Sequence, residues 1–309
     1  MAETLISPGV LARENDSSQI TSQPVQAGAA IVGPTVKGNV NIPTLVTTYS
    51  EYLANFGSTF ESGSDEYSFL TSISAFNYFQ NGGTSLLVTK VASGSFTSAT
   101  SSLIAASAST NNAFTLETLG EGTLMNSDGT YGTNGTLTNG TTDNVRWEIV
   151  NPDLANGVFS VLIRRGDDTN QNKVILETFT NVSLDPKSPN YVARVIGDQT
   201  QTVQGSGTDV YLQTTGNYPN GSRFVRVSSV DKKTPDYFDN NGVAKNAFTS
   251  SIPLAQTGAF GTATGNIVSG MGAAKYYSEI SNTDTQGLLG TNYTTALNLL
   301  ANKDDYRYN

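Results

Sequence analysis

The chain has 309 residues, contains neither cysteine nor histidine, and carries a formal net charge of −9. The missing side chains exclude Ser-His-Asp and Cys-His catalysis, disulfides, thiolate zinc sites and iron–sulfur clusters. The acidic balance is poorly suited to nucleic acid, because binding there relies on lysine and arginine neutralising phosphates. We therefore expect no enzyme, no cofactor, no metal site and no direct nucleic-acid partner.

The N-terminal residues predict an extended arm followed by a strand. Pro8 and Gly9 interrupt regular structure, and residues 13–19 are polar and turn-prone. The apolar run 27–33, bounded by Gly33 and Pro34, predicts a short buried strand. That run is far too short to cross a bilayer, so we expect no membrane insertion.

A helix is predicted next, from about residue 49 to residue 56. Its apolar residues recur at i, i+3, i+4 and i+7, which gives one apolar face. Thr48 and Glu51 have the spacing of a capping box. Gly57 can end the helix with a left-handed backbone conformation.

A second helix is predicted over residues 65–80, followed by a strand over residues 86–91. Asp65 and Glu66 suit the N-terminal dipole of that helix, and Asn81-Gly82-Gly83 suits its end. Its predicted buried stripe consists of Phe69, Ile73, Phe76 and Phe79. Strand, helices and strand in this order indicate a layered α/β unit.

The composition changes after Lys90, where Ser, Thr and Ala begin to dominate and charged residues are absent through Leu116. Residues 126–144 are rich in Gly, Thr and Asn and predict a long loop. Four segments carry β-branched or aromatic residues and are predicted strands: 113–119, 145–150, 158–164 and 224–228. A β-sandwich or an open barrel is the natural class for this region.

Helical spacing returns over residues 273–280 and 293–300, with no closing strand expected afterwards. If these helices pack on the N-terminal strands, the fold is α+β. It then has a layered α/β core, formed by N- and C-terminal parts, with an inserted β-rich domain that is sandwich-like or barrel-like. The expected divisions are an arm over 1–20, a core over 21–92 completed by 266–309, and an insertion over 93–265.

Motifs for ligand binding are weak. Residues 265–270 have the glycine spacing of a phosphate loop, but Met271 replaces the required lysine. Asp168, Asn170 and Asn172 resemble the start of a calcium loop, yet the glycine and the bidentate glutamate that should follow are missing. We expect a solvated turn there, and we also interpret the tripeptide Arg165-Gly166-Asp167 as a turn.

The charged residues of the β-rich region show no catalytic pair. Its carboxylates are expected to be solvated: Glu117, Glu121, Glu148, Glu177 and Asp185. Its basic residues permit two interpretations, charge complementarity between subunits or an ordinary mixed surface. They are Arg146, Arg164, Arg165, Arg194, Arg223, Arg226, Lys232 and Lys233.

Five short segments follow one another in a fixed order. They are 7–14 (SPGVLARE), 29–43 (AAIVGPTVKGNVNIP), 49–57 (YSEYLANFG), 76–91 (FNYFQNGGTSLLVTKV) and 179–196 (FTNVSLDPKSPNYVARVI). In this order they resemble the contractile tail sheath proteins of phages, pyocin-like particles and type VI secretion systems. Lys90 stands where that family usually has arginine.

The resemblance implies a structural subunit that polymerises around a tail tube and contracts to drive it through the target envelope. The implied partners are other sheath subunits, the tail tube and the baseplate. The implied location is the virion tail, assembled in the host cytoplasm. The implied intersubunit arm consists of Ser7, Pro8, Gly9, Val10, Leu11, Arg13 and Glu14.

The end of the sequence departs from the family, whose members continue past a helix like 292–302 into a C-terminal domain that faces the tube. The sequence then looks like the front part of a longer chain, with a naturally short form as the alternative. If the C-terminal domain is missing, we expect a monomer in solution. The alternative function is a β-rich virion surface adhesin or receptor-binding protein. A hydrolase that uses only carboxylates is the third and weakest hypothesis.

Overall fold

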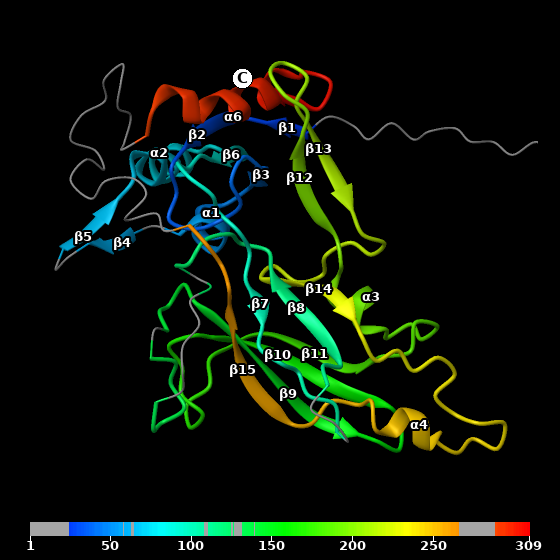
Figure 1. The fold of residues 1–309 in the computed structure, drawn as a ribbon. Coiled ribbons are helices and arrows are strands. Elements are labelled where there is room, and N and C mark those ends of the chain that lie inside the picture. Colours follow the sequence, from blue (N-terminus) through cyan, green and yellow to red (C-terminus); the bar gives the residue numbers. More distant parts are fainter. Residues whose placement is uncertain are drawn as a thin grey trace, which may run out of the picture.

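The computed structural model describes residues 25–57, 59–62, 65–107, 111–124, 126, 132–138, 140–265 and 288–309. The expected arm (1–20) and the expected helix at 273–280 lie outside the described residues. The chain folds into a mixed α and β structure made mostly of strands, in agreement with the α+β expectation (Figure 1). None of the described helices is long and apolar enough to cross a membrane.

A small sheet forms the upper part of the molecule in Figure 1. Its order is β2 (Ala29–Gly33), β6 (Leu86–Lys90), β3 (Pro43–Val46), with β2 parallel and β3 antiparallel to β6. All five residues of β6 are buried, as expected for a central strand. The predicted strands at 27–33 and 86–91 are thus confirmed to within a few residues.

The absence of a closing strand was a wrong expectation. The last residues form β16 (Tyr306–Tyr308), which pairs in parallel with β1 (Val25–Ala27). The Val25 amide donates to Asp305 O (2.9 Å), and the Gly28 amide donates to Ser85 O (3.0 Å). Amides three residues apart in an extended strand point to opposite sides, so β16 and β6 flank the β1–β2 segment from opposite edges.

Helices cover both faces of this sheet. One face of β2 and β6, with Ile31 and Val88, packs against α1 (Tyr49–Phe56) and α2 (Leu70–Gln80). The other face, with Leu87 and its neighbours, packs against α6 (Thr294–Ala301), which follows the short 3-10 helix η1 (Gly290–Tyr293). The result is a three-layer core in which the C-terminal residues lie on the N-terminal strands.

The first predicted helix is confirmed in detail. The Thr48 hydroxyl accepts from the Glu51 amide at 3.1 Å and caps α1. Glu51 reaches back to the amide of Thr47 (2.8 Å) instead of that of Thr48, so the reciprocal half of the box is displaced by one residue. Gly57 ends the helix at φ 70°.

The second helix starts later than predicted and buries a different face. Residues expected in its first turn form β5 (Asp65–Ser68), paired with β4 (Thr59–Ser62) in a hairpin. The buried side chains of α2 are the small Thr71, Ser72 and Ala75. Ile73 and Phe76 of the predicted stripe are instead 44% and 42% exposed. The small residues let the helix approach the sheet closely, which turns the larger apolar side chains outward.

A seven-stranded antiparallel sheet forms the lower part of Figure 1 and curls into a half-barrel. Its strands, in spatial order, are β11 (Ile175–Ser183), β10 (Val158–Arg165), β9 (Val145–Asp153), β15 (Gln256–Gly261), β7 (Thr100–Ser101), β8 (Phe114–Thr118) and β14 (Val225–Val230). Helix α3 (Val192–Ile196) contacts both edge strands, β11 and β14. The four predicted strands correspond to β8, β9, β10 and β14, while β11 and β15 were not predicted.

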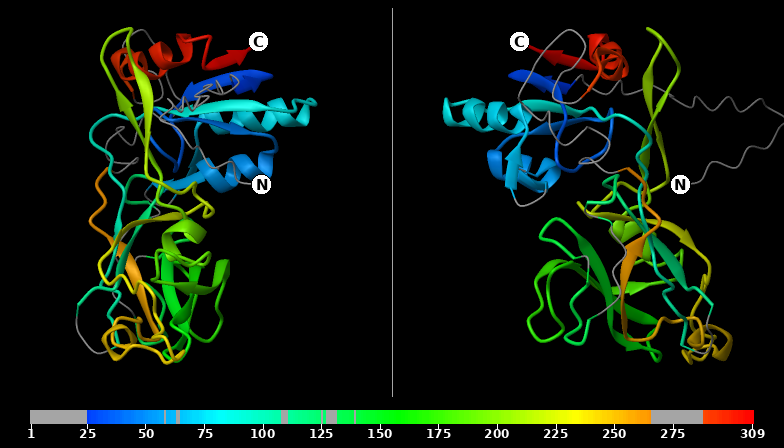
Figure 2. Two further views of the ribbon diagram at one scale, coloured as in Figure 1. Left: turned by 90° about the vertical axis from the view of Figure 1, so that its right-hand side faces the viewer. Right: turned by 60° about the vertical axis from the view of Figure 1, so that its left-hand side comes forward.

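A long hairpin runs back from the half-barrel to the upper sheet (Figure 2). It consists of β12 (Thr200–Gln204) and β13 (Tyr211–Thr215). Val203 and Leu212 pack in the cluster that contains Leu299 and Leu300 of α6. A short helix, α4 (Asn246–Thr249), lies at the far end of the half-barrel.

Candidate functional site

Three segments meet between the three-layer core and the half-barrel, and we call them the neck: residues 91–99, 119–124 and 262–265. The Thr97 amide donates to Thr264 O (3.1 Å), and the Thr123 amide donates to Gly265 O (2.8 Å). Gly122 and Gly265, both at positive φ, lie against the ring of Phe96, where a Cβ would crowd the aromatic atoms. The three segments of the neck thus pack closely around the ring of Phe96.

Lys90, at the end of β6, is buried where the core meets the neck. Its ammonium donates to Gly38 O (3.2 Å) and lies 5.0 Å from the centroid of the Phe96 ring. Burial lowers the pKa of Lys90 to about 8, while the negative charge of Glu121 opposes that decrease. A buried ammonium is tolerated here because a carbonyl, an aromatic face and a carboxylate surround it.

Glu121 joins the neck to the core loop between β2 and β3. Its Oε2 accepts from the Val40 amide at 3.0 Å. Burial raises the pKa of Glu121, and the Val40 amide and the Lys90 charge both work against that rise. Lys37 of the same loop forms an ion pair with Asp143 of the half-barrel at 3.0 Å. Charged groups therefore fix this loop to the other part of the molecule.

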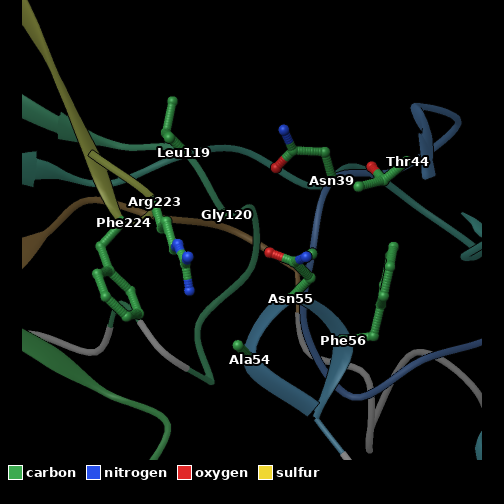
Figure 3. Close-up of a pocket in the computed structure, with 10 residues that line it drawn as sticks. Asn39, Thr44, Ala54, Asn55, Phe56, Leu119, Gly120, Arg223 and Phe224 are labelled. Atoms are coloured by element: carbon green, nitrogen blue, oxygen red, sulfur yellow. The ribbon is translucent and has the colours of Figure 1, made fainter. Parts of the chain in front are cut away.

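Two neighbouring clefts open beside this junction, with volumes of about 160 Å³ and 320 Å³. Asn39, Thr44 and Leu119 line both of them. Figure 3 shows Arg223 and Asn55 on opposite walls of the smaller cleft, one from each part of the molecule. The walls are largely amides, hydroxyls and single charges, and no nucleophile–base arrangement of the kind that catalysis requires is present among these lining residues.

The expectation of a solvated turn is wrong for Asp168, which is buried in an ion cluster, whereas Asn170 and Asn172 are exposed as expected. Asp168 accepts two hydrogen bonds from Arg164, both at 2.8 Å, and pairs with Arg146 at 3.2 Å. Asn170 accepts from both guanidinium groups, at 3.2 Å and 3.3 Å. The oxygens of Asp168 and Asn170 that resembled calcium ligands are therefore occupied by arginine. No group of three or more potential metal-ligating side chains occurs within the described ranges.

The tripeptide at 165–167 lies in a turn with an ion pair between its first and third residues. The Arg165 guanidinium pairs with the Asp167 carboxylate, and both side chains are partly exposed. Of the phosphate-loop pattern, only Gly265 lies within the described residues, and it belongs to the neck.

The carboxylates expected to be solvated all have partners. Glu117 pairs with Arg226 (2.7 Å), and Glu148 pairs with Arg164 (2.9 Å) and Lys173 (2.7 Å). Others accept from backbone amides: Glu121 from Val40, Glu177 from Arg223, and Asp185 from Lys187 and Asp236.

Two of the basic residues are unavailable for contacts between subunits. Arg146 and Arg164 are fully buried. The sequence could not show this, because alternation in β9 and β10 places them inward only when both strands are paired in the observed register.

The residues expected to form an intersubunit arm, from Ser7 to Glu14, lie outside the described residues. The neck was not predicted as a site at all. Its signals in the sequence were the conspicuous Lys90 at the end of a buried strand and the isolated Glu121 in a stretch poor in charge.

Comparison with known proteins identifies similar structures only. No family model and no curated protein matches the chain. A sheath tail protein from Desulfitobacterium hafniense is 12% identical over 71% of this chain and 38% of its own, with a TM-score of 0.27. A sheath tail protein from Listeria innocua is 9% identical over 67% and 34%, with a TM-score of 0.30. The chain thus spans little more than a third of these proteins, and likeness at this level carries no argument about function.

Proposed function

We propose that the chain is a structural subunit of a contractile, phage-type tail sheath that surrounds a tail tube. The observation that carries the proposal is the ordered set of five sheath-like segments in the sequence. Three of them supply β2, α1 and β6, which build one sheet and one of its helix layers. The shared motifs therefore describe a connected core and not scattered surface loops.

The architecture suits a mechanical role. The two parts of the molecule are joined by the neck, by the Lys37–Asp143 ion pair and by the β12–β13 hairpin. Several independent contacts of this kind favour movement of the subunit as one rigid body. Rigid-body switching between two packings of subunits is a recognised way to store and release energy without a catalytic step.

The proposal includes the division of the chain that the sequence suggested. Residues 1–20 form the arm, residues 21–92 with 266–309 the core, and residues 93–265 an outer domain. The arm, through Ser7 to Leu11 together with Arg13 and Glu14, adds strands to sheets of neighbouring subunits, because main-chain hydrogen bonds join chains with little dependence on side chains. The remaining partners are the tail tube and the baseplate, and the location is the virion tail.

Electron microscopy of the purified chain, alone and with tail-tube protein, tests the proposal. We expect rings, tubes or decorated tails from the unaltered chain. A variant that lacks residues 5–17 should remain folded and lose these assemblies. The matched control is Asp167→Asn, which changes a partly exposed charge outside residues 5–17 and should assemble normally. Failure of the unaltered chain to assemble, together with its absence from contractile particles of the source, would contradict the sheath role.

A further inference from the structure

Asparagine followed directly by glycine recurs along the chain. Glycine has no Cβ to keep its main-chain nitrogen away from the preceding side-chain amide, so this pair is chemically labile. The asparagines concerned are Asn81, Asn134, Asn139, Asn156, Asn220 and Asn241. All except Asn139 lie, with their glycines, within the described residues, so the structure can show which of these pairs is free to react.

Two of the pairs are restrained through the asparagine side chain. The Asn81 amide nitrogen donates to Asn77 O at 2.7 Å, at the end of α2. The Asn156 amide nitrogen donates to the Asp153 carboxylate at 2.6 Å, in the turn between β9 and β10. Each of these bonds must break before the side-chain carbon can turn toward the next main-chain nitrogen.

Two further pairs are restrained more strongly or by packing. Asn220 forms two hydrogen bonds with the main chain of Gln199, donating to its carbonyl at 2.8 Å and accepting from its amide at 3.1 Å. Gly135, which follows Asn134, packs directly against the side chain of Asn170. Neither pair has room to rearrange without local opening of the fold.

The pair Asn241–Gly242, in the loop before α4, has neither restraint. Asn241 is exposed, and its side-chain amide has no hydrogen-bond partner within the described part of the chain. A Cβ added to Gly242 would meet no atom within 4 Å. The Gly242 amide does donate to Asp239 O at 3.0 Å, but the glycine amide is hydrogen-bonded in all the described pairs and therefore does not distinguish them.

We propose that Asn241 is a site of spontaneous deamidation in the folded protein. The main-chain nitrogen of Gly242 forms a bond to Cγ of Asn241, and the side-chain NH2 leaves with the Gly242 amide proton as ammonia. Water then opens the resulting succinimide ring at either carbonyl. The products are aspartate, with the normal main chain, and isoaspartate, in which the main chain runs through the former side chain.

The modification changes both charge and loop geometry. It adds one negative charge to a chain whose net charge is already −9. The loop is closed by the Asp239 carboxylate, which accepts from the amides of Asn241 (2.8 Å) and Val243 (2.9 Å). Isoaspartate lengthens the main chain between these two amides, so it should open the loop, whereas aspartate should leave it closed.

Peptide mass analysis of the purified chain, incubated at mildly alkaline pH, tests the proposal. In the native protein, Asn241 should convert about fivefold faster than Asn81, Asn156 or Asn220, the factor that one ordinary hydrogen bond supplies. In guanidinium chloride the four sites should convert at similar rates, because the restraints are lost. A native rate at Asn241 no higher than at the other three would overturn the proposal, and so would the same ranking in denaturant.

The charge and loop effects have their own readout. Incubation should produce a more acidic species on ion exchange, and Asn241→Gln should not produce it, because the longer side chain closes its ring much more slowly. The isoaspartate fraction should show faster hydrogen exchange over residues 238–244, whereas Asn241→Asp should match the unmodified protein. An acidic species that forms equally in Asn241→Gln would place the modification elsewhere, and unchanged exchange in the isoaspartate fraction would refute the opening of the loop.

Discussion

Replacement of Asp168 by asparagine is the sharpest test of how the half-barrel is held together. The carboxylate of Asp168 forms two hydrogen bonds of 2.8 Å with Arg164, an ion pair of 3.2 Å with Arg146, and a bond of 2.9 Å with the Val174 amide. The side chains of Asp168, Arg164 and Arg146 are all inaccessible to solvent. Asp168→Asn keeps the shape of the side chain and removes its charge.

The expected loss of folding stability in Asp168→Asn follows from the charges that remain buried. Arg164 would keep its ion pair with Glu148, whereas both buried guanidinium groups would lose the carboxylate that they share in Asp168. Removal of one partner from a buried ion pair typically costs about 3–5 kcal/mol, because the other charge stays buried without compensation. For a unit of this size, about 2–4 °C of melting temperature is lost per kcal/mol, so the midpoint should fall by about 6–20 °C.

The only tryptophan of the chain, Trp147, is buried next to Arg146 in β9 and reports unfolding of this sheet by its fluorescence. Asp167→Asn is the matched control, because its ion pair with Arg165 is partly exposed and should contribute less than about 1 kcal/mol. Calcium should leave the midpoint of the wild-type protein unchanged. An Asp168→Asn protein whose free energy of unfolding lies within about 1 kcal/mol of wild type would contradict the role of the buried ion cluster, and so would stabilisation of the wild-type protein by calcium.

Three further changes probe other parts of the fold. Because burial lowers the pKa of Lys90 to about 8 from 10.5, the unfolded chain holds more protons between pH 8 and pH 10. The free energy of unfolding should therefore rise by about 2 kcal/mol over that range, and Lys90→Met should abolish the rise in denaturant titrations. Gly258→Ala places a methyl group against the indole of Trp147, so it should lower the free energy of unfolding by about 1–3 kcal/mol and change the tryptophan fluorescence. Gly290→Ala is the control, because its methyl group meets no atom within 4 Å and stability should not change. Thr48→Ala removes the cap of α1 and should cost about 1 kcal/mol, visible as faster hydrogen exchange in that helix.

The sequence predicted α1 well because its signals are local. The cap at Thr48, the glycine that ends the helix and the apolar spacing all lie within ten residues of one another. The start and the buried face of α2 could not be predicted in the same way. Phe69 packs in the interior against Phe60, at 4.7 Å between ring centroids, and the chain before it is already committed to a hairpin. That contact depends on tertiary structure, which outweighs the helical periodicity.

Strands were predicted where apolar and polar residues alternate clearly, and they were missed where the strand forms only because it pairs with another strand. Strands β9 and β10 are rich in β-branched and aromatic residues, whereas β12 is a run of Thr and Gln with little apolar content. β12 is ordered by its pairing with β13 and by the contact of Val203 with the α6 layer. Likewise β16, three residues long, exists as a strand only because β1 offers an open edge.

The neck could not be predicted from the sequence for a related reason, because it brings together charged residues that are distant in the sequence. Lys90 and Glu121 meet only when β6 and the segment after β8 are brought together by the fold. The contacts of this pair and of Lys37 fix the loop between β2 and β3 in place. Glu121 fixes the loop at Val40, Lys90 fixes it at Gly38, and Lys37 of the same loop reaches Asp143 of the half-barrel. A load applied to the half-barrel would therefore pass through this loop into the central sheet.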